Sequence, residues 1–319
     1  MTKDNPQPTQ QLPAAPAWLG PALALGAYAM WGLFPLYFKL LAHINYMEVL
    51  AQRTIWTFIF VFLIMLAMGR FEIFTRGFYL KKTVLIMLAS GVVLAVNWGV
   101  FIVAVNIDQV LQASLGYFMA PLASALLGIF VLGERPSLPR WVSLAMAFVG
   151  VGYMVAGVGD VPWLALALAG SWAVYGLLRK VSPLGSISGL YMETMILGPV
   201  ALAYIIYIAL EPPGLVAQPL FGSTMENAML LIGAGILTAL PLLLFARAAK
   251  LMQLGFIGIL QYLVPTSQFM LAVFVFDEPF GSDRMVTFVC IWIALAIYVA
   301  DSLNTHRTSR KKQSASVSV

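Results

Sequence analysis

The sequence predicts an all-α membrane protein with ten transmembrane helices, arranged as two inverted five-helix repeats. The first observation is composition: 61% of the 319 residues are hydrophobic and only 10% are charged, and the mean hydropathy is +0.91. A water-soluble domain needs far more charge to cover its surface. The second observation is a series of long apolar runs, and the third is a motif pattern that returns after 144 residues.

Ten apolar stretches are each long enough to cross a bilayer. A hydrocarbon core of about 30 Å needs about 20 helical residues. Outer-membrane strands are shorter and alternate polar with apolar residues, so these runs predict helices. The expected spans are 17–42, 47–68, 80–105, 108–132, 138–157, 161–180, 186–210, 227–248, 253–276 and 282–303.

The chain divides into two repeats with a tail at each end. Residues 1–16 hold four Pro and little apolar surface, which predicts a disordered cytoplasmic tail. The first five-helix repeat is expected over 17–157 and the second over 158–303. Residues 304–319 are polar and rich in Lys, Arg and Ser, which predicts a basic cytoplasmic tail.

The distribution of charge predicts the orientation. Of the eighteen Lys and Arg residues, all but Lys39, Arg53 and Arg284 lie in the tails or near alternate connections between spans. The other connections carry most of the acidic residues. This is the positive-inside pattern, which places both termini in the cytoplasm. The net charge of +5 therefore reflects topology, and the expected partner is the lipid bilayer rather than nucleic acid.

An internal repeat explains why the same motifs occur twice. The positions that match at an offset of 144 residues are Pro121 with Pro265, Phe130 with Phe274, Glu134 with Glu278, Arg140 with Arg284, Tyr28 with Trp172, and Trp31 with Tyr175. Each copy holds five spans, so the second copy enters the membrane from the opposite side. Such inverted repeats place a substrate site near the membrane midplane and open it to each side in turn.

Polar side chains inside the spans define a candidate binding pocket, because they are costly in hydrocarbon unless they face a cavity or one another. The pocket would suit a small amphipathic solute with an anionic or strongly polar end. Its expected members are the cations Arg53 and Lys39, the amides Asn97, Gln112 and Gln261, and the aromatic residues Tyr28, Trp31, Trp98 and Tyr117.

Several of these residues also fit structural roles. Lys39 lies far enough along its helix to reach the outer surface. The helix faces that carry Gln112 and Gln261 are also typical of helix packing, and the aromatic residues are also typical of core or interface positions. Glu48 is either the partner of Arg53 or a carrier of a coupling proton. Glu193 is either an interfacial carboxylate or that proton carrier.

Residues that are scarce or missing limit the alternatives. The only histidines are His43 and His306, and Cys290 is the only cysteine, so neither a metal site nor a cofactor is expected. Neither a P-loop nor a G-x-S-x-G motif occurs. The sequence therefore predicts a secondary active transporter rather than an enzyme, with a polar-lined channel or a membrane-embedded enzyme as alternatives.

Several uncommon motifs occur in order along residues 20–303. These are AYAMWGLFPLYFKLL, EVLAQRTIW, NWGVFIVAVN, LQASLGYFMAPL, FVLGERP, LQYLVPT and MVTFVCIWIALAIYVAD. With them the chain resembles RarD-type permeases, the chloramphenicol-sensitivity proteins of the drug/metabolite transporter superfamily, which have paired EamA domains.

The resemblance implies a multi-pass carrier of the bacterial inner membrane that works without a cofactor. The family name does not secure the physiological substrate. From the pocket, the repeat and the resemblance together, we expect an exporter of a small amphipathic metabolite or drug, such as an amino-acid-like solute or chloramphenicol. The chain departs from the family pattern at Gln52, where His is expected, at Gln112, where Glu is expected, and at Ala120, where Asn is expected. The first two changes remove titratable groups, so proton coupling, if present, moves to Glu48 or Glu193.

Overall fold

The protein is described by a computed structural model that covers residue 16 and residues 18–69, 80–133, 135–158, 161–211, 219–252 and 260–317. All the named elements in these ranges are helices, as the apolar runs predict. In chain order they are α1 (Leu19–Gly32), α2 (Phe34–Leu40), α3 (Tyr46–Ala67), α5 (Lys81–Asn106), α6 (Val110–Leu132), α7 (Leu138–Val158), α8 (Trp163–Val181), α9 (Ser186–Leu210), α10 (Met225–Leu251), α12 (Leu263–Phe274) and α13 (Ser282–Val317).

The predicted all-helical membrane architecture is confirmed. The described residues contain nine spans that are long and apolar enough to cross a membrane, and α1 and α2 together form the first of them. The ninth predicted span, 253–276, is seen only as the shorter apolar helix α12, because residues 253–259 lie outside the described ranges. The predicted tail 1–16 lies outside them too, except for Pro16.

The first span is broken, whereas the sequence predicts one continuous helix over 17–42. The break is at Leu33, whose backbone angles of φ −88° and ψ 0° end α1 and precede α2. Pro35 lies at the start of α2. A proline has no N–H to donate to the preceding turn, and its ring clashes with that turn, so the hydrogen-bond ladder stops there. The side chains after Leu33 therefore leave the stripe expected of one straight helix.

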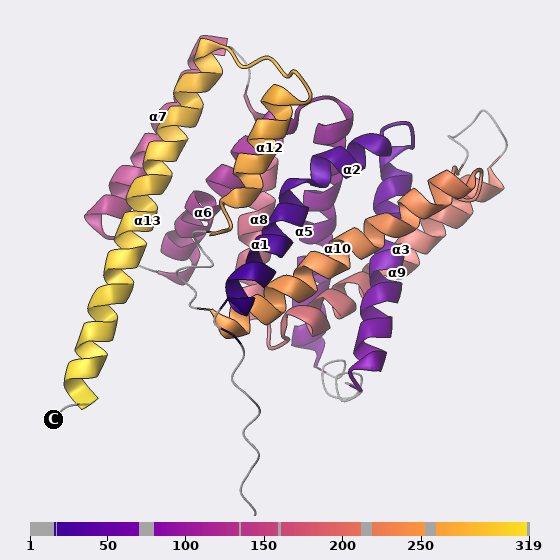
Figure 1. Ribbon diagram of the computed structural model, residues 1–319, viewed down its shortest axis with the longest axis horizontal. Helices are drawn as coiled ribbons and strands as arrows, with labels where there is room; N and C mark the ends of the chain where they lie inside the picture. Colours follow the sequence, from indigo (N-terminus) through magenta and orange to yellow (C-terminus); the bar gives the residue numbers. More distant parts are fainter. Residues whose placement is uncertain are drawn as a thin grey trace, which may run out of the picture.

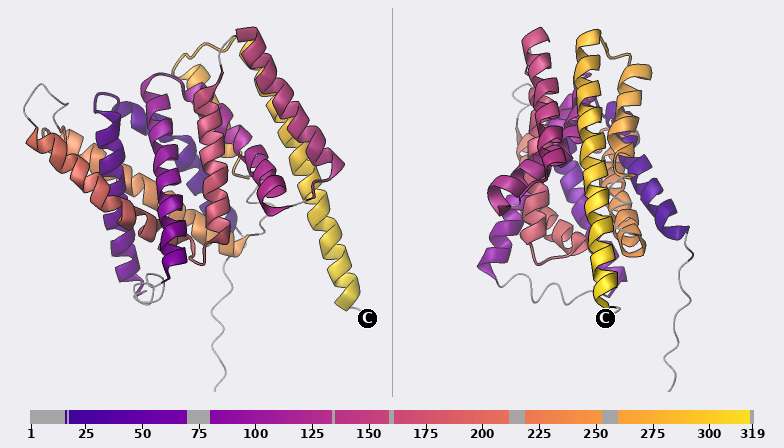
Figure 2. Two further views of the ribbon diagram at one scale, coloured as in Figure 1. Left: turned by 180° about the vertical axis from the view of Figure 1, so that it is seen from behind. Right: turned by 90° about the vertical axis from the view of Figure 1, so that its left-hand side faces the viewer.

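The helices form an elongated bundle (Figures 1 and 2). α7 and α13 pack together at one end of the bundle, and α3 packs on α9 toward the other end. α1, α5, α6, α8 and α12 lie between them. The start of α1 and the end of α13 lie on the same side of the bundle, and α13 continues as a helix through most of the basic segment 304–319.

The two halves of the chain make equivalent helix contacts. This is seen when each of the first five spans is matched with the span at the same place among the second five. α6 packs on α8 as α12 packs on α1, and α5 packs on α9 as α10 packs on α3. Gly91 and Gly235, which are 144 residues apart, lie in the second of these pairs. A Cβ on Gly91 would lie 3.4 Å from the carbonyl oxygen of Glu193, and one on Gly235 would lie 2.4 Å from Cβ of Trp56. Gly235 therefore permits a close helix approach that a side chain would block, whereas a Cβ at Gly91 would make only an ordinary van der Waals contact.

A second equivalence lies just after the fourth span of each half. Gly133 has φ 66° and Asp277, 144 residues later, has φ 52°, so both adopt the left-handed conformation. Glu278 follows Asp277, and its carboxylate accepts hydrogen bonds from the backbone N–H groups of Val110 (2.6 Å) and Leu111 (2.8 Å) at the start of α6. Burial raises the pKa of Glu278, and these two N–H groups act in the opposite direction. The Glu278 carboxylate thus fixes the start of α6.

Candidate substrate-binding site

Arg53 is the centre of the candidate site. It lies two turns into α3 and is only 3% exposed. Its guanidinium carbon lies 4.2 Å from the ring centroid of Trp98, 5.0 Å from that of Phe38 and 5.6 Å from that of Phe34. A cation over aromatic faces is stabilised by the ring quadrupoles, by about 2 kcal/mol when the pair is desolvated. The break before α2 places Phe34 and Phe38 beside Trp98 around the guanidinium. We call these three rings the cage.

The hydrogen bonds of Arg53 leave part of its guanidinium without a partner. Nε donates to Oγ1 of Thr238 in α10 over 2.8 Å. Nη1 is buried and has no hydrogen-bond partner among the described residues, and Arg53 forms no ion pair with any of them. A guanidinium stays protonated in proteins. The site therefore presents a buried positive charge with unused donors, sealed from bulk solvent in this conformation.

Tyr117 and Asn97 lie beside the cage and are joined to each other. The Tyr117 hydroxyl donates to Oδ1 of Asn97 over 3.3 Å, and Tyr117 lies close enough to Arg53 for an electrostatic interaction. Nδ2 of Asn97 donates to the carbonyl oxygen of Leu168 and to Oγ of Ser171, over 3.2 Å and 2.9 Å. Asn97 thus holds α5, α6 and α8 together, and both ends of its amide are engaged.

Glu48 does not pair with Arg53. Its carboxylate accepts hydrogen bonds from the backbone N–H groups of Leu220 (2.9 and 3.0 Å) and Phe221 (2.9 Å). It fastens the segment before α10 to the start of α3. The pairing with Arg53 that the sequence suggests as one role for Glu48 is therefore replaced by a contact with the backbone.

Glu193 lies in a second buried polar cluster, between α5, α8 and α9. It is 0% exposed and accepts hydrogen bonds from the hydroxyls of Ser90 and Tyr175. Nη1 of Arg179 lies 3.6 Å from its Oε1, and Arg179 also donates to the carbonyl oxygen of Gly185 over 2.8 Å. Glu193 is thus a fully buried carboxylate with its own cation.

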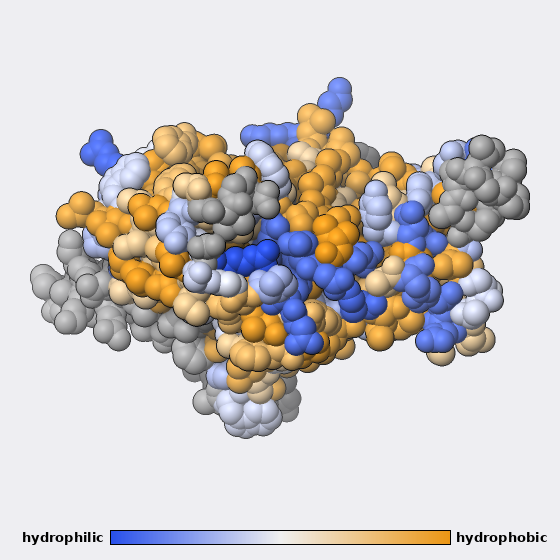
Figure 3. Space-filling view, turned by 90° about the horizontal axis from the view of Figure 1, so that it is seen from above, coloured by the Kyte–Doolittle hydropathy of each residue, from blue (hydrophilic) through white to orange (hydrophobic). Residues whose placement is uncertain are grey.

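Lys39 lies outside the cage. It pairs with Asp108, which follows α5 and is 63% exposed in its side chain. Seen from above, the molecule has polar residues over the middle of this face and apolar residues around them (Figure 3). Lys39 therefore reaches the surface, the alternative that the sequence leaves open, and the structure does not bring it together with Arg53.

The other predicted aromatic and amide residues are spread over three places. Tyr28 and Trp31 pack on Phe245 of α10 with ring centroids 6.0 Å and 5.9 Å from it, in an aromatic cluster of α1. Gln261 is exposed in the turn before α12. Gln112 faces the other side of α6, toward α7 and α13. Of the nine residues expected in the pocket, Arg53, Trp98, Tyr117 and Asn97 are brought together.

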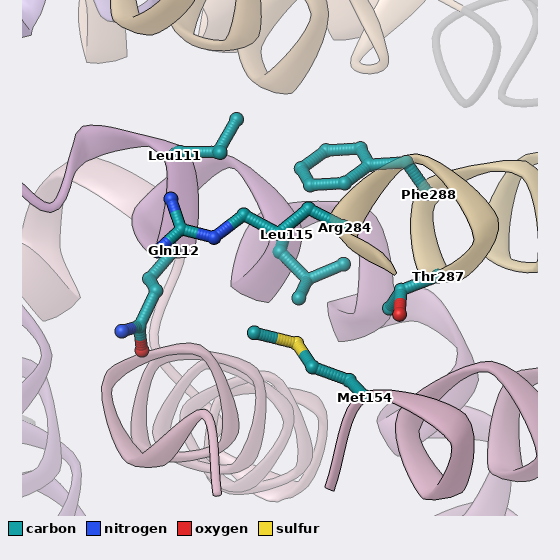
Figure 4. A pocket seen from close by; sticks show the side chains of 7 residues that line it. All are labelled: Leu111, Gln112, Leu115, Met154, Arg284, Thr287 and Phe288. Carbon is teal, nitrogen blue, oxygen red and sulfur yellow. The ribbon is translucent and has the colours of Figure 1, made fainter. Parts of the chain in front are cut away.

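Gln112 lines a very small cavity instead of the cage. Its side chain, Arg284 and Met154 converge on this cavity from α6, α13 and α7 (Figure 4). The cavity holds about 10 Å³, which is close to the lower limit for one water molecule. Oε1 of Gln112 is buried without a partner among the described residues. This is too little space for an organic solute.

Sequence reasoning misses several residues that surround Arg53 and Glu193, among them Phe34, Phe38, Thr238 and Arg179. Phe34 and Phe38 follow the Leu33 break, which no periodicity reveals, although Pro35 marks it. Thr238 is 185 residues from Arg53 along the chain and looks like any other membrane hydroxyl. Arg179 lies beside Lys180 at the end of its span, where it looks like a positive-inside charge.

Comparison with known proteins supplies the family. Residues 18–156 match the EamA-like transporter family. The chain is 40% identical over 292 residues to Protein RarD of Escherichia coli (strain K12), which covers 92% of this chain and 97% of that protein. It is 39% identical over 287 residues to the uncharacterized transporter YojE of Bacillus subtilis (strain 168), covering 89% and 94%.

More distant similarity agrees with this result. The chain is 27% identical over 297 residues to a Pseudomonas aeruginosa protein named Chloramphenicol-sensitive protein RarD, covering 92% of this chain and 97% of that protein. A solved crystal structure shares the fold, with a TM-score of 0.55 and 17% identity over 87% of this chain and 96% of the other. The chain belongs to the RarD-type permeases of the EamA-like transporter family and is a membrane transporter.

Proposed function

We propose that this chain is a secondary active exporter of the bacterial inner membrane, which binds a small amphipathic solute at Arg53 and moves it by alternating access. The observation that carries the proposal is the buried Arg53 guanidinium with unused donors and no ion pair among the described residues. Burying a charge costs several kcal/mol unless a partner compensates. A ligand with an anionic or strongly polar end supplies that partner.

The position of the cage between the two halves supports alternating access. Arg53, Trp98 and Tyr117 belong to residues 17–157, whereas Thr238 belongs to residues 158–303. Movement of one half against the other would break the hydrogen bond from Arg53 to Thr238 and open the cage. The equivalent helix contacts of the two halves favour two inverted repeats, the architecture in which such movement is expected.

The proposal also includes the orientation of the chain in the membrane and the coupling of transport to proton movement. The positive-inside pattern favours cytoplasmic termini, and the start of α1 and the end of α13 lie on one side of the bundle. Glu193 is the favoured carrier of a coupling proton, because its carboxylate is fully buried next to hydroxyl groups. Glu48 is less favoured, because backbone N–H groups already bind its carboxylate.

Counterflow in proteoliposomes tests the carrier. Vesicles are loaded with a high concentration of chloramphenicol, phenylalanine, 3-phenylpropanoate or uridine, and entry of the same labelled solute is followed. A carrier gives a transient, saturable overshoot for at least one of these solutes, and Arg53→Ala abolishes it, with the folded variant confirmed by size-exclusion chromatography. Flux that rises linearly with concentration and shows no overshoot would instead indicate a channel. An overshoot that Arg53→Ala leaves unchanged would remove Arg53 from the site.

A further inference from the structure

We infer that the Arg53 site selects hydrophobic monocarboxylates, and that it discriminates against both zwitterionic amino acids and neutral solutes such as chloramphenicol. The inference rests on the proposed function, because it names the class of substrate bound at the same site. Three features of the cage lead to it: the donors that remain free, the character of the walls, and the absence of an available acidic group among the described residues.

The free donors of Arg53 Nη1 fit a carboxylate oxygen. Nε of Arg53 is engaged by Thr238, which leaves the end of the guanidinium that carries Nη1. Nη1 carries two N–H groups, and a charged donor of this kind binds a carboxylate oxygen strongly. The two neighbouring hydroxyls already donate elsewhere, Thr238 to the carbonyl oxygen of Ala234 and Tyr117 to Asn97. A phosphate, with a third oxygen to satisfy and more charge, lacks further donors here.

The walls fit an apolar substituent. Phe34, Phe38 and Trp98 surround the cation. Tyr117 continues this surface, with its ring centroid 6.1 Å from that of Phe101. Aromatic rings in this arrangement bind other rings and branched alkyl groups through edge-to-face and dispersion contacts. A hydrophilic tail would lose its hydration against these rings without gaining hydrogen bonds.

An α-ammonium group finds no counter-charge beside the cage. The described residues include three buried acids, and all are engaged elsewhere: Glu48 by the backbone of 220–221, Glu193 by Ser90 and Arg179, and Glu278 by the start of α6. The side-chain oxygen of Asn97 already accepts from Tyr117. A zwitterion bound at Arg53 would therefore bury an unpaired ammonium, which costs several kcal/mol. A neutral solute would leave Arg53 itself unpaired, and sites with unsatisfied polar groups reject such analogues strongly.

Three solutes with one phenyl ring and the same chain length separate these cases. They are 3-phenylpropanoate (an anion), 3-phenylpropanamide (its neutral isostere) and L-phenylalanine (the zwitterion). Ligand-induced thermal stabilisation of the purified full chain is measured near neutral pH, where the carboxyl groups are ionised. We expect the anion to bind about 10- to 100-fold more tightly than the other two, since one charge-assisted interaction is worth about that factor.

Variants connect the preference with the site. Arg53→Gln removes the charge and is expected to abolish the preference for the anion. Arg284→Gln is the matched control, because Arg284 is a half-buried cation of α13 that lines the small cavity and not the cage; it should bind all three solutes as the wild type does.

The possible outcomes separate the inference from the proposed function. Equal or tighter binding of phenylalanine or the amide, with an overshoot that depends on Arg53, overturns the substrate class and leaves the carrier intact. An anion preference that survives in Arg53→Gln places the site elsewhere. Failure of all three solutes to stabilise the wild type contradicts the substrate class whether or not another solute shows counterflow. The comparison of the three solutes on the wild-type protein decides the substrate class even if the Arg53 variant fails to fold.

Discussion

Arg53 and Arg179 are both largely buried arginines, but they differ in their partners. Arg179 has a carboxylate 3.6 Å away and two backbone carbonyl oxygens as acceptors. Gly189 leaves the room for it, since a Cβ there would lie on its guanidinium. Arg53 has aromatic faces and one hydroxyl. The charge of Arg179 is therefore used within the fold, whereas that of Arg53 remains available to a ligand.

Replacing Glu193 with Gln tests the proposed coupling proton. Gln keeps one acceptor oxygen, which serves Ser90 or Tyr175 but not both, and it binds no proton. Net efflux driven by a pH gradient should therefore lose its dependence on that gradient. Counterflow, which needs no net proton movement, should persist. The assay compares both rates in one batch of proteoliposomes, with Glu226→Gln, an exposed change at the start of α10, as the control. A wild-type response of Glu193→Gln to the gradient would exclude it as the proton carrier.

The sequence singles out the charged residue of the site but not its surroundings. Arg53 is recognisable because it lies well inside an apolar span, where a cation is costly and seldom has a purely structural role. Its cage depends on the backbone break at Leu33 and on a helix 185 residues away. Neither periodicity nor composition contains those distances. For the same reason Lys39 and Gln112, which share helices with cage residues, are predicted in the pocket but point elsewhere.

At the scale of helices, the position where a helix begins depends on the polar side chain that binds its free backbone N–H groups. Glu278 satisfies two N–H groups at the start of α6 that have no partner within the helix, and its negative charge also suits the positive end of the helix dipole. The apolar runs predict each described span to within a few residues. They do not predict which loop residue closes which helix, because the carboxylate and the N–H groups are far apart in sequence.

Glu278→Ala is expected to destabilise the protein by about 1–3 kcal/mol, because two buried N–H groups lose their acceptor. Thermal unfolding in detergent should show a lower melting temperature than the wild type. Glu226→Ala serves as the comparison: Glu226 is an exposed acid in the first turn of α10, where a charge contributes only a few tenths of a kcal/mol to about 1 kcal/mol. Equal melting temperatures for the two variants would contradict the anchoring role of Glu278.

At the scale of the molecule, the offset of 144 residues has structural counterparts. The left-handed conformation recurs at Gly133 and Asp277, and equivalent helices are in contact, α6 with α8 as α12 with α1. The loop and helix positions that repeat are backbone features, and the binding residues are not repeated: position 197, which matches Arg53 at this offset, is Leu. A site with one cation can therefore lie between two halves that are similar in backbone and different in chemistry.

Cysteine labelling tests the orientation of the bundle. In a Cys290→Ser background, Arg135→Cys and Ser223→Cys place thiols at exposed positions before α7 and before α10. A membrane-impermeant maleimide applied to the periplasmic side of spheroplasts should modify Ser223→Cys and spare Arg135→Cys until the membrane is opened. The reverse pattern would place both termini outside.

The enclosure of Arg53 also limits kinetics. A ligand on the guanidinium cannot leave until the helices around it separate, so its residence time cannot be shorter than the interval between openings. Such helix movements take microseconds to milliseconds or longer. Weak ligands would therefore share one ceiling on their dissociation rate, set by the protein. Substitutions that loosen the contact between α3 and α10 would raise this ceiling for every ligand by the same factor, without changing the order in which the site ranks them.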